Sequence, residues 1–149
     1  MCLWPVHDSL PLRDDIETIH AATDLLAEAK LSPELRNEAL YYRAKAYTKQ
    51  KADKKAMEDY RELAKDTRNS YGAEAKYQVA QSLYDAKEYA AAEKELLNYI
   101  EKSTPHAYWL ARSFILLSDV YHATGKDLDA RQYLLSLQQN FKGMTILKA

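Results

Sequence analysis

The chain has few of the residues that interrupt helices. It contains only three Gly and four Pro among 149 residues, so we expect few turns and long helices. Cys2 is the only cysteine, which excludes a disulfide within the chain. No run of apolar residues approaches about 18, the length that indicates a membrane-spanning helix, so we expect no membrane span.

An excess of one charge sign is also missing. The 21 Lys and Arg nearly balance the 22 Asp and Glu, and the formal net charge is −1. Domains that bind nucleic acids carry clustered basic residues and a positive net charge. We therefore expect no nucleic-acid partner.

Motifs that would hold a metal or a phosphate group are absent from the sequence. The four His do not fall in an HExxH or paired-His spacing, and one Cys cannot form a CxxC motif. Three isolated Gly cannot build a phosphate-binding loop. The carboxylates are dispersed along solvated faces, as in EKEL. The sequence therefore predicts no enzyme, no metal site and no cofactor.

Three pairs of small residues recur at a constant spacing of twelve positions. The pairs are Ala44 and Ala56, Ala80 and Ala92, and Ser118 and Ala130. The second pair follows the first by 36 residues, and the third follows the second by 38. Small side chains let two helices approach closely, so each pair predicts the crossing point of an antiparallel helix hairpin. Larger residues share this frame: Tyr47, Leu83 and Tyr121, then Tyr60, Leu96 and Leu134, then Leu63, Tyr99 and Leu137.

Signals for helix ends fit the same frame. Ser32 can cap a helix that begins with Pro33, and Thr104 with Pro105 repeats this signal. Gly125 suits the C-terminus of a helix. Apolar residues recur at steps of three and four, and no strand pattern is present. We predict an all-α fold of about seven helices, over residues 13–30, 34–50, 53–67, 71–87, 89–102, 106–123 and 127–140.

Residues 73–105, AEAKYQVAQSLYDAKEYAAAEKELLNYIEKSTP, resemble the tetratricopeptide repeat, a helix–turn–helix unit of about 34 residues. Its signature positions hold Val79, Ala80, Leu83, Tyr89, Ala92, Leu96, Tyr99 and Pro105. Residues 37–68 and 111–142 resemble the same repeat, and residues 13–33 resemble its second helix alone. The resemblance implies an α-α superhelix, a right-handed solenoid of antiparallel helix pairs. It would form a single domain over residues 13–142, between tails at 1–12 and 143–149.

In this family the first helix of each repeat lines a concave surface that binds partner proteins. The resemblance implies a binding surface formed by Tyr41, Lys45, Lys49, Tyr77, Gln81, Tyr84, Asp85, Arg112, Asp119 and His122, with Glu38, Thr48, Glu74 and Ile115 beside them. Aromatic rings among mixed charges suit peptide recognition. The alternative is that the Tyr side chains only fill gaps between neighbouring first helices.

One type of partner is not expected. Chaperone-binding members of the family grip a C-terminal carboxylate with Lys and Asn residues. Tyr41, Lys45 and Gln78 stand where that set would place Lys, Asn and Asn. The resemblance therefore does not extend to an adaptor for chaperone tails.

The repeats are most similar to those of bacterial envelope proteins such as the Tol–Pal coordinator and the outer-membrane assembly lipoproteins. This similarity implies a periplasmic or outer-membrane-associated protein; otherwise we expect a cytoplasmic one. The predicted function is a non-catalytic scaffold for a protein or peptide partner. The alternative is a self-assembly or spacer module of a larger repeat array that acts through its exposed C-terminal helix. There Leu134, Leu135 and Phe141 would form a homodimer or dock against the rest of a longer protein.

Overall fold

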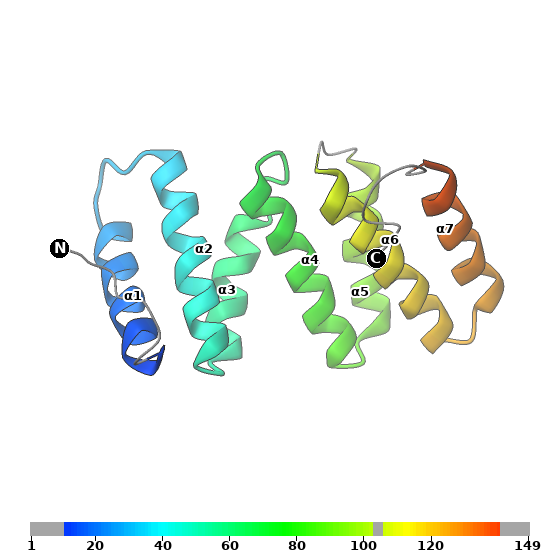
Figure 1. Ribbon diagram of the computed structural model, residues 1–149, viewed down its shortest axis with the longest axis horizontal. Helices are drawn as coiled ribbons and strands as arrows, with labels where there is room; N and C mark the ends of the chain where they lie inside the picture. Colours follow the sequence, from blue (N-terminus) through cyan, green and yellow to red (C-terminus); the bar gives the residue numbers. More distant parts are fainter. Residues whose placement is uncertain (1–10, 103–105, 141–149) are drawn as a thin grey trace. The chain divides into compact units, whose positions relative to one another are not determined.

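The computed structural model describes residues 11–102 and 106–140, which form seven α-helices and no strand (Figure 1). The all-α class and the number of helices are as predicted. The helices are α1 (Pro11–Leu26), α2 (Pro33–Lys49), α3 (Asp53–Leu63), α4 (Ser70–Asp85), α5 (Tyr89–Glu101), α6 (Ala107–Ala123) and α7 (Asp127–Asn140). No helix in these two ranges is both long enough and apolar enough to cross a membrane.

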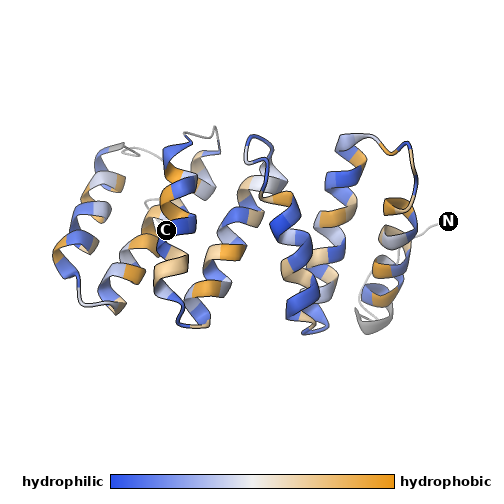
Figure 2. Ribbon diagram, turned by 180° about the vertical axis from the view of Figure 1, so that it is seen from behind, coloured by the Kyte–Doolittle hydropathy of each residue, from blue (hydrophilic) through white to orange (hydrophobic). Residues whose placement is uncertain are grey.

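The contacts divide the chain into two compact units. The first unit, residues 1–63, contains α1 to α3, and the second, residues 64–149, contains α4 to α7. Their boundary falls inside the domain expected over residues 13–142. Each helix carries both hydrophobic and hydrophilic residues (Figure 2). Each unit has buried apolar residues of its own, such as Leu40 and Leu63 in the first and Leu96 and Leu117 in the second.

Two helices begin at side-chain caps, of which the one at Ser32 was predicted. The Ser32 side-chain oxygen accepts a hydrogen bond from the backbone N–H of Leu35 at 3.2 Å, and Pro33 is the first residue of α2. The Asn69 side-chain oxygen accepts one from the backbone N–H of Gly72 at 2.8 Å, before α4. Each bond satisfies a donor that a helix N-terminus leaves open. The predicted cap at residues 104–105 lies outside the described residues.

Two helices end four residues earlier than predicted, α1 at Leu26 and α3 at Leu63. Just beyond α3, the Asp66 carboxylate accepts a hydrogen bond from the backbone N–H of Arg68 at 3.0 Å. The Asn69 side chain donates to the backbone carbonyl oxygen of Asp66 at 3.1 Å. Such local side-chain bonds give the backbone an alternative to helical hydrogen bonds, which explains the early end of α3.

The three hairpin turns share one backbone motif. Lys51, Lys87 and Gly125 have φ angles of 60°, 63° and 80°. The residue after each donates its backbone N–H back into the preceding helix, to the carbonyl oxygens of Tyr47 at 2.9 Å, Leu83 at 2.8 Å and Tyr121 at 2.7 Å. This closure is the Schellman motif. Its members are 36 and 38 residues apart, so the backbone repeats with the same spacing as the sequence.

The predicted small residues lie in the core. All six members of the three pairs are between 0% and 7% exposed. In the third pair the Ser118 hydroxyl donates to the backbone carbonyl oxygen of Ala130 at 3.1 Å, which places the two helices in contact at the predicted point. In the second unit, Ala80 and Ala92 belong to one core cluster.

A part-buried ion pair connects the helices of the first unit. The Arg43 guanidinium donates two hydrogen bonds to the Asp59 carboxylate, at 2.8 Å and 2.7 Å, and one to the Thr23 hydroxyl at 3.1 Å. These three residues lie on α2, α3 and α1. The hydrogen bond with Asp59 is the main cause that raises the pKa of Arg43. A bidentate pair of this kind adds geometric specificity as well as stability. Arg43 therefore helps to set how the three helices pack against one another.

Candidate binding surface

The ten residues predicted to form the concave surface all lie on the first helices of the three hairpins. Tyr41, Lys45 and Lys49 belong to α2 in the first unit. The other seven belong to the second unit, on two helices that pack together. They define the α4/α6 surface: Tyr77, Gln81, Tyr84 and Asp85 on α4, and Arg112, Asp119 and His122 on α6.

A chain of hydrogen bonds joins α6 to α4 across this surface. The Arg112 guanidinium donates to the hydroxyl oxygen of Tyr77 at 3.1 Å and to that of Tyr108 at 3.3 Å. The Tyr77 hydroxyl in turn donates to the side-chain oxygen of Gln81 at 3.0 Å. The Gln81 amide then donates to the Asp85 carboxylate at 2.9 Å. Four of the predicted residues are therefore connected: Arg112 on α6 is joined through Tyr77 to Gln81 and Asp85 on α4.

Arg112 is held by aromatic groups and not by a carboxylate. Its guanidinium carbon lies 5.2 Å from the ring centroid of Tyr77 and 5.9 Å from that of Tyr108. The hydrogen bond with Tyr77 is the first cause that raises the pKa of Arg112. Within the described parts of the chain, no carboxylate forms an ion pair with this guanidinium. Its positive charge therefore has no anionic partner there.

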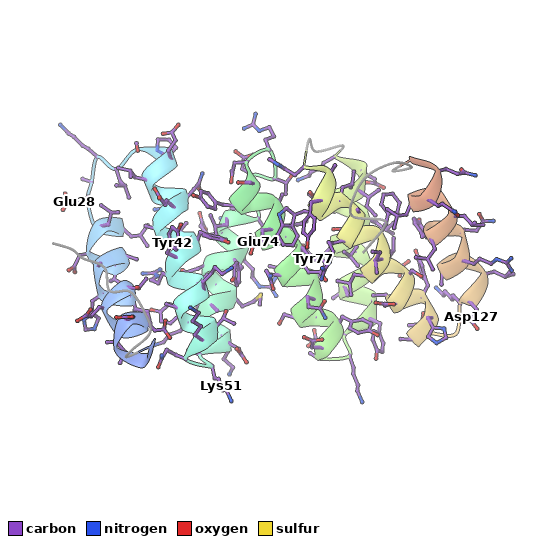
Figure 3. The ribbon with its side chains drawn as sticks, viewed as in Figure 1. Glu28, Tyr42, Lys51, Glu74, Tyr77 and Asp127 are labelled. Atoms are coloured by element: carbon purple, nitrogen blue, oxygen red, sulfur yellow. The ribbon has the colours of Figure 1, made fainter. Side chains whose placement is uncertain are left out.

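Tyr77 belongs to the core of the second unit and not to its open surface. It lies between α4 and α6 (Figure 3) and is only 7% exposed. Its ring packs in the cluster that contains Ala80 and Leu117, and its centroid is 5.5 Å from that of Trp109. For Tyr77 the packing alternative therefore applies. Its contribution to the α4/α6 surface is the hydroxyl group that positions Arg112.

The far end of the α4/α6 surface is negative. Burial raises the pKa of the Asp119 carboxyl, and the neighbouring His122 opposes this shift. Burial, and then the charge of Asp119, raise the pKa of the half-buried Tyr84 hydroxyl. Asp119 follows Arg112 by seven residues on α6, which is about 10 Å along the helix axis. The exposed side chain of Ile115 lies between them in sequence. The surface thus carries a positive site, an apolar step and a negative site.

His122 marks the edge of this surface. Its Nδ1 atom lies 2.8 Å from a carboxylate oxygen of Asp127, the first residue of α7. Both side chains are largely exposed. The contact joins the end of α6 to the start of α7, so His122 takes part in the turn as well as in the predicted surface.

The predicted residues of the first unit form a smaller patch. The Lys45 ammonium donates to the Tyr41 hydroxyl oxygen at 3.2 Å and lies 5.1 Å from the centroid of the same ring. The rings of Tyr41 and Tyr42 meet edge to face with centroids 5.3 Å apart. Lys49 is exposed at the end of α2. This patch repeats the combination of a cation with an aromatic ring.

Two residues at the α4/α6 surface were missed by the sequence analysis. Tyr108 binds Arg112, and Trp109 meets the rings of both Tyr108 and Tyr77, at 4.8 Å and 5.5 Å. The family positions do not include either residue. A signal was available, because residues four apart on a helix lie on the same face and Tyr108 precedes Arg112 by four.

The alternative surface, on α7, exposes apolar side chains. Leu134 and Leu135 are 45% and 43% exposed, and Leu128 is more exposed than either. The side chains of α7 that face the core include Ala130, Tyr133 and Leu137. Phe141, the third residue predicted for this surface, lies outside the described residues.

The described residues include no group of three or more His, Cys, Asp or Glu side chains arranged to hold a metal ion. Comparison with protein-family models, with curated proteins and with solved structures found no match for this chain. The geometry of the α4/α6 surface is therefore the basis for a functional proposal.

Proposed function

We propose that this chain is a non-catalytic scaffold of the tetratricopeptide-repeat type, and that its α4/α6 surface binds an acidic segment of a partner protein. Three Schellman turns and three buried small-residue pairs at matching spacings support a solenoid of repeated hairpins. The observation that carries the functional part is Arg112, a half-buried guanidinium held by two tyrosines without a carboxylate partner in the described parts of the chain.

The setting of Arg112 favours binding of an anion. A cation that is partly removed from water loses solvation, and an anion compensates for that loss more fully than neutral hydroxyl groups do. Of the five N–H donors of a guanidinium, two bind the hydroxyls of Tyr77 and Tyr108, which leaves three. Because the side chain is already held in place, little conformational entropy is lost when a ligand binds. A carboxylate would form charge-assisted hydrogen bonds with the remaining donors.

The rest of the surface defines the other features of the ligand. Ile115 and the half-buried ring of Tyr84 provide apolar contact next to the charged sites. Asp119, about 10 Å from Arg112 along α6, has no hydrogen-bond partner among the described residues and suits a basic side chain. An extended peptide covers about 10 Å in three residues. The preferred segment is therefore an acidic residue, an apolar step, and a basic residue three positions from the first.

A selection from a random peptide display library tests this proposal. The immobilised baits are the wild-type chain, Arg112→Gln, and Arg131→Gln, which removes the same charge from the exposed surface of α7. We expect wild type and Arg131→Gln to enrich peptides with Asp or Glu, and Arg112→Gln to lose that enrichment. Equal enrichment by all three baits, or no enrichment by the wild type, would reject the proposal. Circular dichroism confirms that the baits are folded.

Self-assembly remains the second candidate, because α7 exposes Leu128, Leu134 and Leu135. Large exposed apolar side chains that cluster on one helix favour contact with another surface. Sedimentation velocity of the wild-type chain and of a Leu134→Glu/Leu135→Glu variant tests this alternative. A wild-type dimer that becomes a monomer in the variant would support self-assembly. A wild-type chain that stays monomeric at high concentration would reject it.

A further inference from the structure

The first unit contains an apolar groove that takes no part in the α4/α6 surface. It lies between α1 and α2, has a volume of about 440 Å³, and is lined by residues that include Ala22, Leu25, Leu35, Glu38 and Tyr42. Leu35 is 46% exposed and Tyr42 is 49% exposed, although both are large apolar or aromatic side chains. Figure 3 shows Tyr42 on α2.

The second unit contains the same arrangement with the groove filled. α2 and α6 both have 17 residues, and Ser118 of α6 stands where Ala44 of α2 stands, 74 positions earlier. Both helices pack against the helix that precedes them, which is α1 for α2 and α5 for α6. With this offset, the groove residues Leu35, Glu38 and Tyr42 correspond to Trp109, Arg112 and Leu116.

Two of these α6 residues contact α4, and the third belongs to the same core cluster as α4 residues. The ring of Trp109 lies 5.5 Å from that of Tyr77, and Arg112 donates a hydrogen bond to the Tyr77 hydroxyl. Leu116 belongs to the core cluster that contains Tyr77 and Ala80. In the second unit, α4 therefore packs where the groove lies in the first unit.

Exposure of the corresponding residues shows the difference directly. Leu116 is 3% exposed beneath α4, whereas Tyr42 at the same position of α2 is 49% exposed. Among the described helices of the first unit, none packs on α1 and α2 as α4 packs on α5 and α6. Among the residues that the structure describes, the groove therefore holds no helix at the place that α4 takes on α5 and α6.

We propose that the groove between α1 and α2 binds an amphipathic helix of another polypeptide, placed as α4 is placed on α5 and α6. The pattern of α4 defines its contact face: a large side chain, a small residue three positions on, and an apolar residue after three more, as in Tyr77, Ala80 and Leu83. Glu38 lines the groove where Arg112 contacts Tyr77 in the second unit. The position facing Glu38 therefore takes a Lys or Arg. This inference does not depend on the α4/α6 surface.

Two synthetic peptides test the inference. Both have the sequence of α4, residues 70–85, with blocked ends and a fluorescent label; one carries Tyr77→Arg and the other Tyr77→Glu. Binding to the full chain is measured by fluorescence anisotropy. Because Glu38 attracts the first and repels the second, we expect the Arg peptide to bind about three- to tenfold more tightly. The preference should reverse in a Glu38→Arg chain.

A matched pair of chain variants locates the binding. Leu35→Asp puts a charge in the groove and should abolish binding, whereas Ile16→Asp changes a similarly exposed apolar residue of α1 that does not line the groove and should leave binding unchanged. Circular dichroism of both variants checks folding. Absence of binding, or equal affinity for the two peptides, would overturn the proposal. Binding seen only after removal of residues 1–10 would assign the groove to the chain's own N-terminal segment instead. A wild-type dimer that becomes a monomer in Leu35→Asp would assign the groove to a second copy of this chain.

Discussion

The hydroxyl group of Ser118 donates a hydrogen bond to the backbone carbonyl oxygen of Ala130 across 3.1 Å. The two residues are twelve positions apart and lie on the two helices of one hairpin, α6 and α7. A side chain as short as Ser reaches the backbone of the partner helix only where the two helices come close. Ala80 and Ala92 have the same spacing and are both fully buried.

The hairpin crossing at Ala92 should not accept a long side chain. Ala92→Arg forces a charged group into a core that leaves no exposed surface at this position, and we expect a loss of about 3 kcal/mol in the free energy of unfolding. Ala90→Arg, at an exposed position on the same helix, should change it by less than about 0.5 kcal/mol. Urea denaturation measures both. An Ala92→Arg chain as stable as the wild type would show that the crossing lies elsewhere.

The Schellman turns should become more stable with glycine. Lys51 and Lys87 adopt the left-handed conformation that glycine tolerates best, so Lys51→Gly and Lys87→Gly should each raise the free energy of unfolding by about 0.5–1 kcal/mol. Gly125→Ala should lower it by a similar amount. A Cβ atom at Gly125 would meet no atom within 4 Å, so that loss comes from the backbone alone.

Lys94→Gly is the control for these turn substitutions. This exposed residue lies in the interior of α5, where glycine should destabilise by about 1 kcal/mol. Chemical denaturation of the four variants gives the comparison. If Lys51→Gly and Lys87→Gly lower the free energy of unfolding as Lys94→Gly does, the left-handed conformation of these lysines does not cost stability, and the prediction is wrong.

The Asp119 carboxyl should make stability depend on pH. Burial raises its pKa above the ordinary value of 3.8, so ionisation at neutral pH disfavours the folded state. Asp119→Asn should therefore be more stable than wild type at pH 7, by less than about 1 kcal/mol because water still screens this site. The advantage should disappear at about pH 3, where the carboxyl is protonated in both states. Thermal denaturation across this range checks it, and an advantage that persists at low pH would argue against a burial effect.

The local features of the fold could be predicted from the sequence. The Ser32 cap with Pro33 and the Ser118–Ala130 crossing depend on residues close together in the chain, and the structure contains both. The bidentate pair of Arg43 with Asp59 was not predicted, because it depends on the rotation of α2 against α3. Periodicity identifies the buried side of a helix but not which polar groups on neighbouring helices meet.

The candidate site could be predicted only in part. The family positions placed Arg112 and Asp119 on the same helix, but they gave Tyr77 as a surface residue although the structure buries its ring. That burial follows from the packing of Tyr77 on α4 against Trp109, which is not one of the family positions. Residues 13–33 were predicted to be the second helix of an incomplete repeat. The groove between α1 and α2 was not predicted, because it depends on how the side chains of the two helices pack.

Binding of a partner carboxylate by Arg112 is measured most directly by a double-mutant cycle. Isothermal titration calorimetry compares an acidic peptide selected by the wild-type chain with its Asp→Asn or Glu→Gln form, on wild type, Arg112→Gln and the control Arg131→Gln. We expect removal of the peptide carboxylate to weaken binding about tenfold on wild type and on Arg131→Gln, and hardly at all on Arg112→Gln. An equal loss on all three chains would show that the carboxylate does not bind at Arg112.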